Sequence, residues 1–200
     1  MALMRKVVGQ VPVRHESDPL AVLVHGSTDE RWGAARVAAS LPGGVEALSA
    51  ALATESDARV RSAMFTSMAR LATPACVDAI VPYLRSDDSN LRTGALDALR
   101  SMPNAVLPML PALLNDPDAD VRLLTCEIVR GLGTAEATLL LCDVLACEAD
   151  VNVCAAAVDV LAEIGGPHAV AALQGCADRF PGEAFLGFAI KMAIQRIGSP

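Results

Sequence analysis

The stretch Asp118-Ala-Asp-Val-Arg122, which continues through apolar residues to Leu132-Gly133, decides the fold of this chain. Its Asp-x-x-x-Arg spacing returns along the sequence at a pitch of 30 to 31 residues. Such a pitch is typical of stacked two-helix repeats, because each unit can bury its apolar face only against its neighbours. The earlier copies of the pattern are Asp57/Arg61 and Asp88/Arg92.

Apolar residues follow the same period and indicate which segments are helical. In the first helix of each unit they are separated by steps of four, four and three, which keeps them on one face of an α-helix and does not fit a strand. A weaker copy begins at Glu30, and proline or glycine follows each helix, because neither continues a helix interior well. The stripes are Val60, Met64, Met68, Leu71; Leu91, Ala95, Leu99, Met102; Val121, Thr125, Val129, Leu132; and Val153, Ala157, Leu161, Ile164.

A second helix is predicted after each of these turns, so the sequence predicts an all-α, right-handed α-α superhelix of about five helix pairs. A last helix over 183–197 is expected to close the stack as a C-terminal capping helix, since an open end would expose apolar surface. We expect one solenoid domain over 19–198. Residues 1–18 are expected to form an N-terminal arm, either a flexible tail or a strand-like peptide that docks on a solenoid. The predicted second helices are 45–53, 75–85, 105–115, 135–147 and 168–178.

These units resemble the HEAT-like repeats of phycobilisome lyase-like proteins, which read Asp-x-x-Val-Arg, then alanine and leucine at helical spacing, then Leu-Gly. Asp118 to Arg122, followed by Leu132-Gly133, is the best match, and the resemblance extends over residues 28 to 180. The resemblance implies the fold, but it leaves the function open, because such units serve adaptors, chaperones and some enzymes.

The repeated aspartates and arginines have a structural explanation. An aspartate at a helix start accepts hydrogen bonds from unpaired backbone N–H groups, and an arginine one turn later can reach the adjacent unit. We therefore predict a structural ladder. In the fifth unit Asp150 is kept, but Cys154 replaces the arginine, after an apparent insertion near Val151-Asn152. The ladder residues are Asp57, Arg61, Asp88, Arg92, Asp118 and Arg122.

Composition excludes several classes of function. The net charge of −7, with 16 Lys and Arg, does not favour nucleic acid as the ligand. The longest uncharged stretch, 101–115, is too short to span a bilayer, and we expect a cytoplasmic protein. The six cysteines form no Cys-x-x-Cys pair, so we expect reduced, mostly buried thiols and no metal site, although a pair such as Cys142 with Cys176 stays open. No catalytic or cofactor-binding motif is present, and we expect no cofactor.

A binding surface is expected on the second helices, which in stacked helix pairs line the concave side. Its polar residues form a sparse, mildly acidic set, so a basic or amphipathic protein segment would suit it. The candidate residues are Glu46, Asp78, Tyr83, Arg85, Asn115, Glu136, Asp143 and Gln174.

We therefore expect a non-enzymatic scaffold or adaptor that holds another protein by preorganisation, since a rigid surface loses little entropy on binding. Two alternatives stay open. The resemblance implies a bilin lyase or chromophore-handling chaperone, which the low aromatic content of 3% does not favour. An obligate structural subunit would use the helix that carries Phe185, Phe188 and Met192 as an assembly contact, and would form a homodimer through it.

Overall fold

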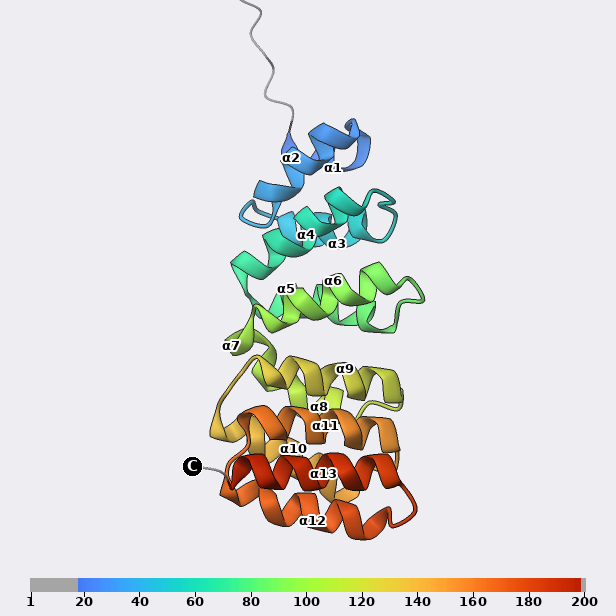
Figure 1. Cartoon of the computed structure of the whole chain (residues 1–200). Helices are drawn as coiled ribbons and strands as arrows, with labels where there is room; N and C mark the ends of the chain where they lie inside the picture. Colours follow the sequence, from blue (N-terminus) through green and yellow to red (C-terminus); the bar gives the residue numbers. More distant parts are fainter. Residues whose placement is uncertain (1–17, 199–200) are drawn as a thin grey trace, which may run out of the picture.

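A computed structural model describes residues 18–198, and it confirms the predicted all-α solenoid. Five helix pairs and a last single helix stack along one direction, from α1 at one end to α12 and α13 at the other (Figure 1). The predicted arm falls outside the described residues except for Asp18, whose carboxylate accepts from the backbone N–H of Leu20 and caps α1 (Pro19–His25).

The first helices of the units form one layer, which we call the first-helix layer. Each packs on the first helix of the next unit, so that the layer is continuous from end to end. Its helices are α2 (Thr28–Ala38), α4 (Ala58–Leu71), α6 (Ser89–Arg100), α9 (Ala119–Arg130), α11 (Val151–Ile164) and α13 (Ala184–Ile197).

The second helices form the other layer, the second-helix layer, and α1 packs on α2 and α3 as the remaining half of an incomplete unit. Two second helices that we predicted as continuous are interrupted in the structure. Pro82 is the second residue of a 3-10 segment, and Pro108 and Pro111 divide the second helix of the third unit, because proline has no N–H to donate within a helix. The elements are α3 (Gly44–Leu52), α5 (Pro74–Ile80), η1 (Val81–Arg85), α7 (Pro103–Val106), η2 (Leu107–Met109), α8 (Leu110–Leu114), α10 (Ala135–Cys147), η3 (Pro167–Ala169) and α12 (Val170–Arg179).

The core lies between the two layers and uses the predicted stripes. Val60, Met64 and Met68 are fully buried on α4, and the predicted stripe residues of the third, fourth and fifth units are buried or half-buried. Leu71 is the exception, because it is the last residue of α4 and remains 39% exposed. Thr125 is buried within its stripe, and its hydroxyl donates to the Val121 carbonyl at 2.6 Å.

Candidate functional site

The loops that lead into α4, α6, α9 and α11 each carry a polar residue two positions before the aspartate N-cap. This residue accepts a hydrogen bond from the backbone N–H of the aspartate. The aspartate in turn accepts from N–H groups of the first helical turn, as Asp57 does from Arg59 and Val60. The loop residues are Glu55, Ser86, Asp116 and Glu148, and they bond to Asp57, Asp88, Asp118 and Asp150 at 2.9, 3.2, 3.0 and 2.8 Å.

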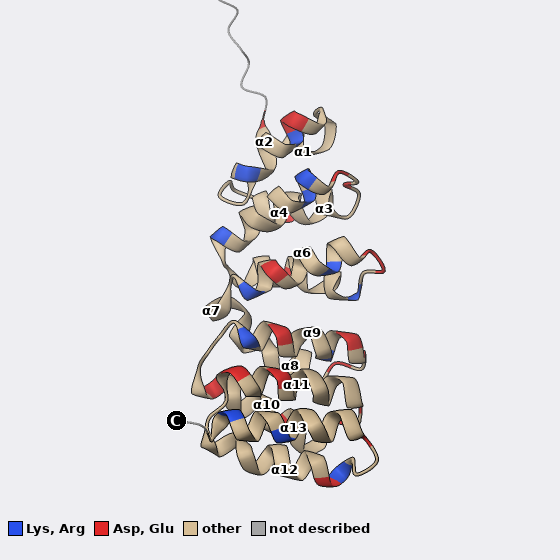
Figure 2. Cartoon of the chain, in the orientation of Figure 1, with Lys and Arg blue, Asp and Glu red and all other residues tan. Residues whose placement is uncertain are grey.

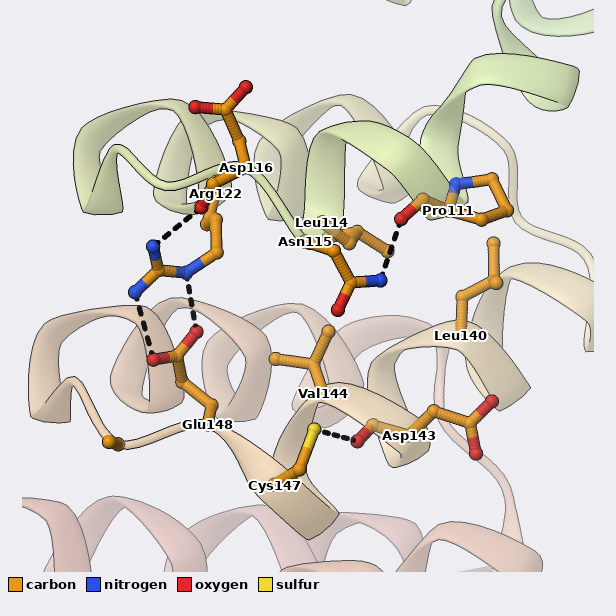
Figure 3. Close-up of a pocket in the computed structure, with 11 residues that line it drawn as sticks. Pro111, Leu114, Asn115, Asp116, Arg122, Leu140, Asp143, Val144, Cys147 and Glu148 are labelled. Atoms are coloured by element: carbon orange, nitrogen blue, oxygen red, sulfur yellow. Dashed lines mark hydrogen bonds and ion pairs between the residues drawn. The ribbon is translucent and has the colours of Figure 1, made fainter.

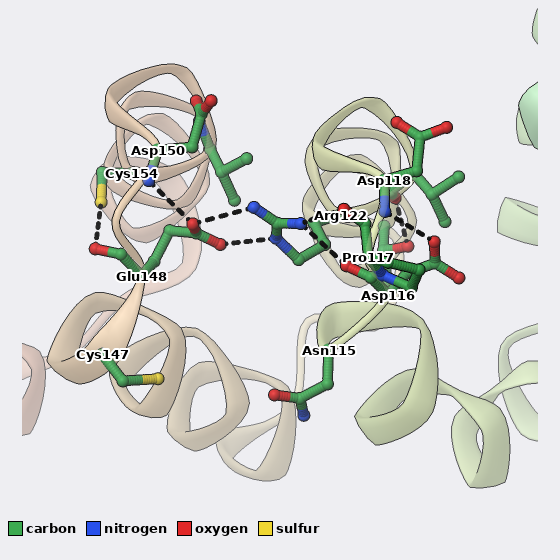
Figure 4. A network of polar contacts seen from close by, with 12 residues as sticks. Asn115, Asp116, Pro117, Asp118, Arg122, Cys147, Glu148, Asp150 and Cys154 are labelled. Atoms are coloured by element: carbon green, nitrogen blue, oxygen red, sulfur yellow. Dashed lines mark hydrogen bonds and ion pairs between the residues drawn. The ribbon is translucent and has the colours of Figure 1, made fainter.

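Two of these loop residues, Glu55 and Glu148, also accept hydrogen bonds from the arginine of the preceding unit. Arg122 donates two hydrogen bonds to Glu148, at 2.7 and 3.0 Å, and a third to the Asp116 carbonyl at 2.7 Å (Figure 4). Burial raises the pKa of Glu148, but the hydrogen bonds from Arg122 and from the Asp150 backbone outweigh it, and the pKa is lowered. Arg31 binds Glu55 in the same two-point geometry at 2.7 and 3.1 Å.

The other two junctions use different partners. Arg61 donates to Asp88 at 2.7 Å, which lowers the pKa of that carboxyl. Arg92 instead donates to the Ser86 carbonyl of its own unit. The carboxylate of Asp116, which Arg92 would reach in a regular ladder, is bound by Arg85 from η1.

Cys154 stands in the fifth unit at the position that arginine occupies elsewhere. Its thiol donates to the Glu148 carbonyl at 3.6 Å, six residues earlier, as Arg122 donates to the carbonyl of Asp116. Burial, followed by the neighbouring Cys176 thiol, raises the pKa of Cys154 to about 12. Cys154 lies four residues after the Asp150 N-cap, so the insertion that we predicted near Val151-Asn152 is wrong. All six cysteines are free, so Cys142 and Cys176 form no disulfide, and Cys154 lies beside Cys176.

The second-helix layer opens between α8 and α10, and we call this opening the α8–α10 groove (Figure 3). It has a volume of about 420 Å³. The prolines of the third unit shorten α8 to residues 110–114, so that its side chains meet those of α10 across an open space. The residues that line the groove are Pro111, Leu114, Asn115, Asp116, Arg122, Leu140, Asp143, Val144, Cys147, Glu148 and Ala149.

The α8–α10 groove has an apolar floor and a polar rim. Leu114 and Val144 are buried in the floor, while Asn115 and Asp143 are exposed at the rim. The Asn115 amide donates to the Pro111 carbonyl at 2.8 Å, which holds that side chain against α8. Arg122 and Glu148 lie at one end of the groove and neutralise each other's charge. The carboxylate of Asp143 therefore gives the groove a net negative charge.

An exposed thiol also lines the α8–α10 groove. Cys147 donates to the Asp143 carbonyl at 3.3 Å, and its side chain is accessible from solvent. The remaining cysteines are buried or half-buried. Cys147 is therefore a natural position for a chemical probe of the groove.

The structure brings together only part of the predicted binding set. Asn115 and Asp143 meet in the α8–α10 groove, and Arg85 adjoins it through its ion pair with Asp116. Tyr83 is half-buried, with its ring edge-on to Phe65 at 5.9 Å between centroids. The others are exposed on separate second helices: Glu46 on α3, Asp78 on α5, Glu136 on α10 and Gln174 on α12.

Sequence reasoning missed Glu55 and Glu148, although a signal for them exists. A polar side chain stands two positions before each aspartate N-cap, but its chemical type changes from unit to unit. Within residues 18–198, we find no group of three or more His, Cys, Asp and Glu side chains arranged to hold a metal ion. In the same range, none of the helices combines the length and apolar character that a bilayer crossing requires.

Comparison with known proteins places the repeats in a family. The family model for HEAT repeats matches residues 45–110 and 106–183, which is more than half of the chain. The chain belongs to the HEAT repeat family. A comparison with curated proteins gives no match.

Several solved structures are similar to this HEAT repeat chain. Two are engineered proteins that are each 20% identical to it. The first has a TM-score of 0.43 and is matched over 90% of this chain and 94% of its own. The second has a TM-score of 0.46 and is matched over 91% of this chain and 98% of its own. A third is the complex of CpcE and CpcF of phycocyanin lyase from Nostoc sp. PCC7120. It is 18% identical, with a TM-score of 0.38, over 96% of this chain and 100% of that chain.

Proposed function

We propose that this HEAT repeat chain is a non-enzymatic scaffold that binds a segment of another protein along its second-helix layer, with the α8–α10 groove as the principal contact. HEAT repeats serve as protein-interaction surfaces, and stacked helix pairs bind partners through such extended layers. The observation that carries the proposal is the groove between α8 and α10, which opens to solvent above an apolar floor of buried side chains.

The chemistry of the groove selects the kind of segment that it accepts. Apolar side chains of a partner would pack on the half-buried Leu140, above the buried Leu114 and Val144, while a lysine or arginine would pair with Asp143. Glu136 lies on the same helix as Asp143 and is also exposed, so it extends the negative charge along α10. A basic, amphipathic segment therefore fits best.

The groove is formed by a rigid framework. Arg122 and Glu148 fix its end with two hydrogen bonds to each other, and both side chains are mostly buried. A surface that is already ordered loses little conformational entropy when a partner binds. Partner binding would then require little rearrangement of α8 and α10.

The first test is native mass spectrometry on the tagged protein isolated from its own host, with an absorbance spectrum of the same fraction. We expect a stoichiometric protein partner that is lost from Asp143→Arg and retained by Asp97→Arg, which reverses a charge on the first-helix layer. The bound partner should also slow alkylation of Cys147. A partner that is kept by Asp143→Arg, with Cys147 still reactive, would contradict the proposal.

The same fraction also tests the chromophore-handling alternative. Among the described residues that line the α8–α10 groove there is no aromatic ring to cover a tetrapyrrole. A stoichiometric visible absorbance band without a co-purifying protein would overturn the scaffold proposal and support the alternative.

A further inference from the structure

The charged residues of the described chain divide unevenly between the two layers. Among residues 18–198, every Lys and Arg except Arg85 and Arg179 lies on a helix of the first-helix layer (Figure 2). The second helices instead carry exposed carboxylates, and no Lys or Arg of that range lies within ion-pair distance of them. These carboxylates belong to Glu46, Asp78, Glu136, Asp143 and Asp178.

The basic residues near the α8–α10 groove do not neutralise Asp143. Arg85 pairs with Asp116, and Arg122 pairs with Glu148. The Arg179 guanidinium donates to the Leu145 carbonyl at 2.6 Å, at the junction of α12 with α10, and Arg179 is not one of the residues that line the groove. The Asp143 carboxylate therefore has no cationic partner.

An exposed apolar side chain adjoins Asp143 on α10. Leu139 is 56% exposed and lies one helical turn before Asp143, so the two side chains share one face of the helix. The next residue, Leu140, is half-buried and lines the groove. A segment that covers this face needs aliphatic side chains directly beside basic ones.

The sequence that precedes α1 has this composition. Residues 1–17 contain three basic side chains and one acidic side chain, and the basic pair Arg5-Lys6 is followed directly by the valine pair Val7-Val8. Valine, Gly9 and Pro12 are poor helix formers, so these residues are better suited to binding as an extended chain than as a helix. The charged residues are Arg5, Lys6, Arg14 and Glu16.

The N-terminal arm leaves the solenoid on the layer that carries the groove. Asp18 caps α1, which packs on α3 of the second-helix layer. Along this layer α3, α5 and α8 lie between α1 and α10, so at about 8–10 Å per helix the groove is roughly 25–40 Å from α1. An extended chain covers about 3.3 Å per residue, so residues 7–18 span about 36 Å. Val7 and Val8 are therefore within reach of the groove.

We propose that the N-terminal arm docks along the second-helix layer of its own chain, with Val7 and Val8 on the α8–α10 groove and Lys6 paired with Asp143. The proposal rests on the scaffold function, because the arm has the basic, amphipathic character of the partner segment that the groove fits. The arm is then an internal competitor for the groove. A partner must displace it, which lowers the partner's apparent affinity in proportion to the fraction of open chains.

The tether favours docking within one chain over docking between copies. A flexible tether gives the arm an effective concentration of about 1 mM at the groove. A weak contact, with a Kd of about 0.1 mM, would then be about nine-tenths occupied within the chain. Between chains at about 10 µM, the same contact would be about one-tenth occupied.

Carbodiimide cross-linking tests the docking on the full chain, at about 1 µM, where contacts between chains are negligible. The reagent joins a lysine amine to a carboxylate that it touches, and the lysines of this chain are Lys6 in the arm and Lys191 on α13. We expect peptide mass spectrometry to find Lys6 linked to Asp143 within one chain. Lys191 lies on the first-helix layer and should not link to Asp143, so it is the internal control.

Variants separate the docked contact from chance encounters of the arm. Val7→Asp/Val8→Asp keeps Lys6 but removes the apolar contact, and it should lose the link without changing any residue of the solenoid. Phe188→Asp changes a side chain that is 64% exposed on the first-helix layer, and it should keep the link. A wild type in which Lys6 links to no carboxylate of α10 would overturn the proposal, and so would a link that occurs only in cross-linked dimers.

A labelled synthetic peptide of residues 1–17 measures the competition without the host partner. Titrated to about 1 mM and followed by fluorescence anisotropy, it should bind Val7→Asp/Val8→Asp about tenfold more tightly than wild type, because the variant's groove is open. The same peptide with Arg5→Glu/Lys6→Glu should not bind. Equal binding to both proteins would show that the arm does not occupy the groove.

Failure of the arm proposal and failure of the scaffold function give different results. Without arm docking the Lys6 link is missing, while a host partner is still lost from Asp143→Arg. Without the scaffold function no host partner depends on Asp143, while the Lys6 link and the peptide competition remain.

Discussion

Replacing Arg122 by alanine should destabilise the chain by about 3 kcal/mol at neutral pH, because it leaves Glu148 buried without its charged partner. The side chains of Arg122 and Glu148 are only 16% and 8% exposed, so water cannot replace the two hydrogen bonds that are lost. The Asp116 carbonyl loses a donor as well. For a chain of this size, a loss of about 3 kcal/mol lowers Tm by about 6 to 12 °C.

The pH dependence of that loss provides a second, independent measurement. In the wild type the pKa of Glu148 is lowered below its ordinary value of 4.5, so its contribution is present above that pH and is lost as pH falls through the folded-state pKa. In Arg122→Ala the hydrogen bonds from the arginine are absent, so burial should dominate and raise the pKa of Glu148. The variant should then be most destabilised at pH 7.5, and the difference from wild type should narrow near pH 4.5.

Urea unfolding followed by far-UV circular dichroism measures both effects. Arg59→Ala is the control, because it removes an arginine from an ion pair whose side chains are 62% and 86% exposed and from a contact with the Trp32 ring, and its cost should stay below about 1 kcal/mol. Adding Glu148→Gln to Arg122→Ala should recover part of the loss. A free energy of unfolding for Arg122→Ala within about 0.5 kcal/mol of wild type at pH 7.5 would refute the reasoning.

Three further outcomes are expected. Gly94→Ala should destabilise the chain by about 1 kcal/mol in urea titrations, because the new Cβ would lie 2.8 Å from the buried Phe65 ring and overpacking exceeds the gain in helix propensity; a more stable variant would contradict this. In native protein, Cys147 should react with a thiol reagent long before Cys126, whose pKa burial raises to about 12; equal rates would contradict the described packing. The hydrogen bond from Arg31 lowers the pKa of Glu55, so the stability of the wild type should fall as pH drops below about 4.5. Glu55→Gln should make the free energy of unfolding less dependent on pH in that range; an unchanged pH dependence would show that Glu55 is not its cause.

The helices were predictable from sequence because their signals are local. Steps of four, four and three identify a helix face within one unit, and Asp118 marks a helix start within one turn. Because the pattern recurs at a constant pitch and similar units stack in the same way, the prediction made for one unit applies to the whole array. These signals were sufficient to predict an all-α solenoid.

The α8–α10 groove could be predicted only in part, because it depends on how two units lie against each other. Asn115 and Asp143 were expected on one layer, but their meeting depends on Pro108 and Pro111, which shorten α8. The role of Glu148 was missed because its partner, Arg122, is 26 residues away, and pairing across units leaves no periodic pattern of one residue type. Both the groove and this ion pair are determined by contacts between units rather than by the sequence of a single unit.

The junctions between units also bear on how a repetitive chain avoids misfolding. Similar units can pair out of order during folding, which is a known failure of repeat proteins. Here Arg31–Glu55 and Arg122–Glu148 share one geometry, whereas Arg61 uses Asp88 and Asp116 is taken by Arg85. Consecutive junctions in the middle of the array therefore have different polar partners. A unit that skipped its neighbour would leave charged groups unmatched, so the order of the units is encoded in the junctions as well as in the chain connectivity.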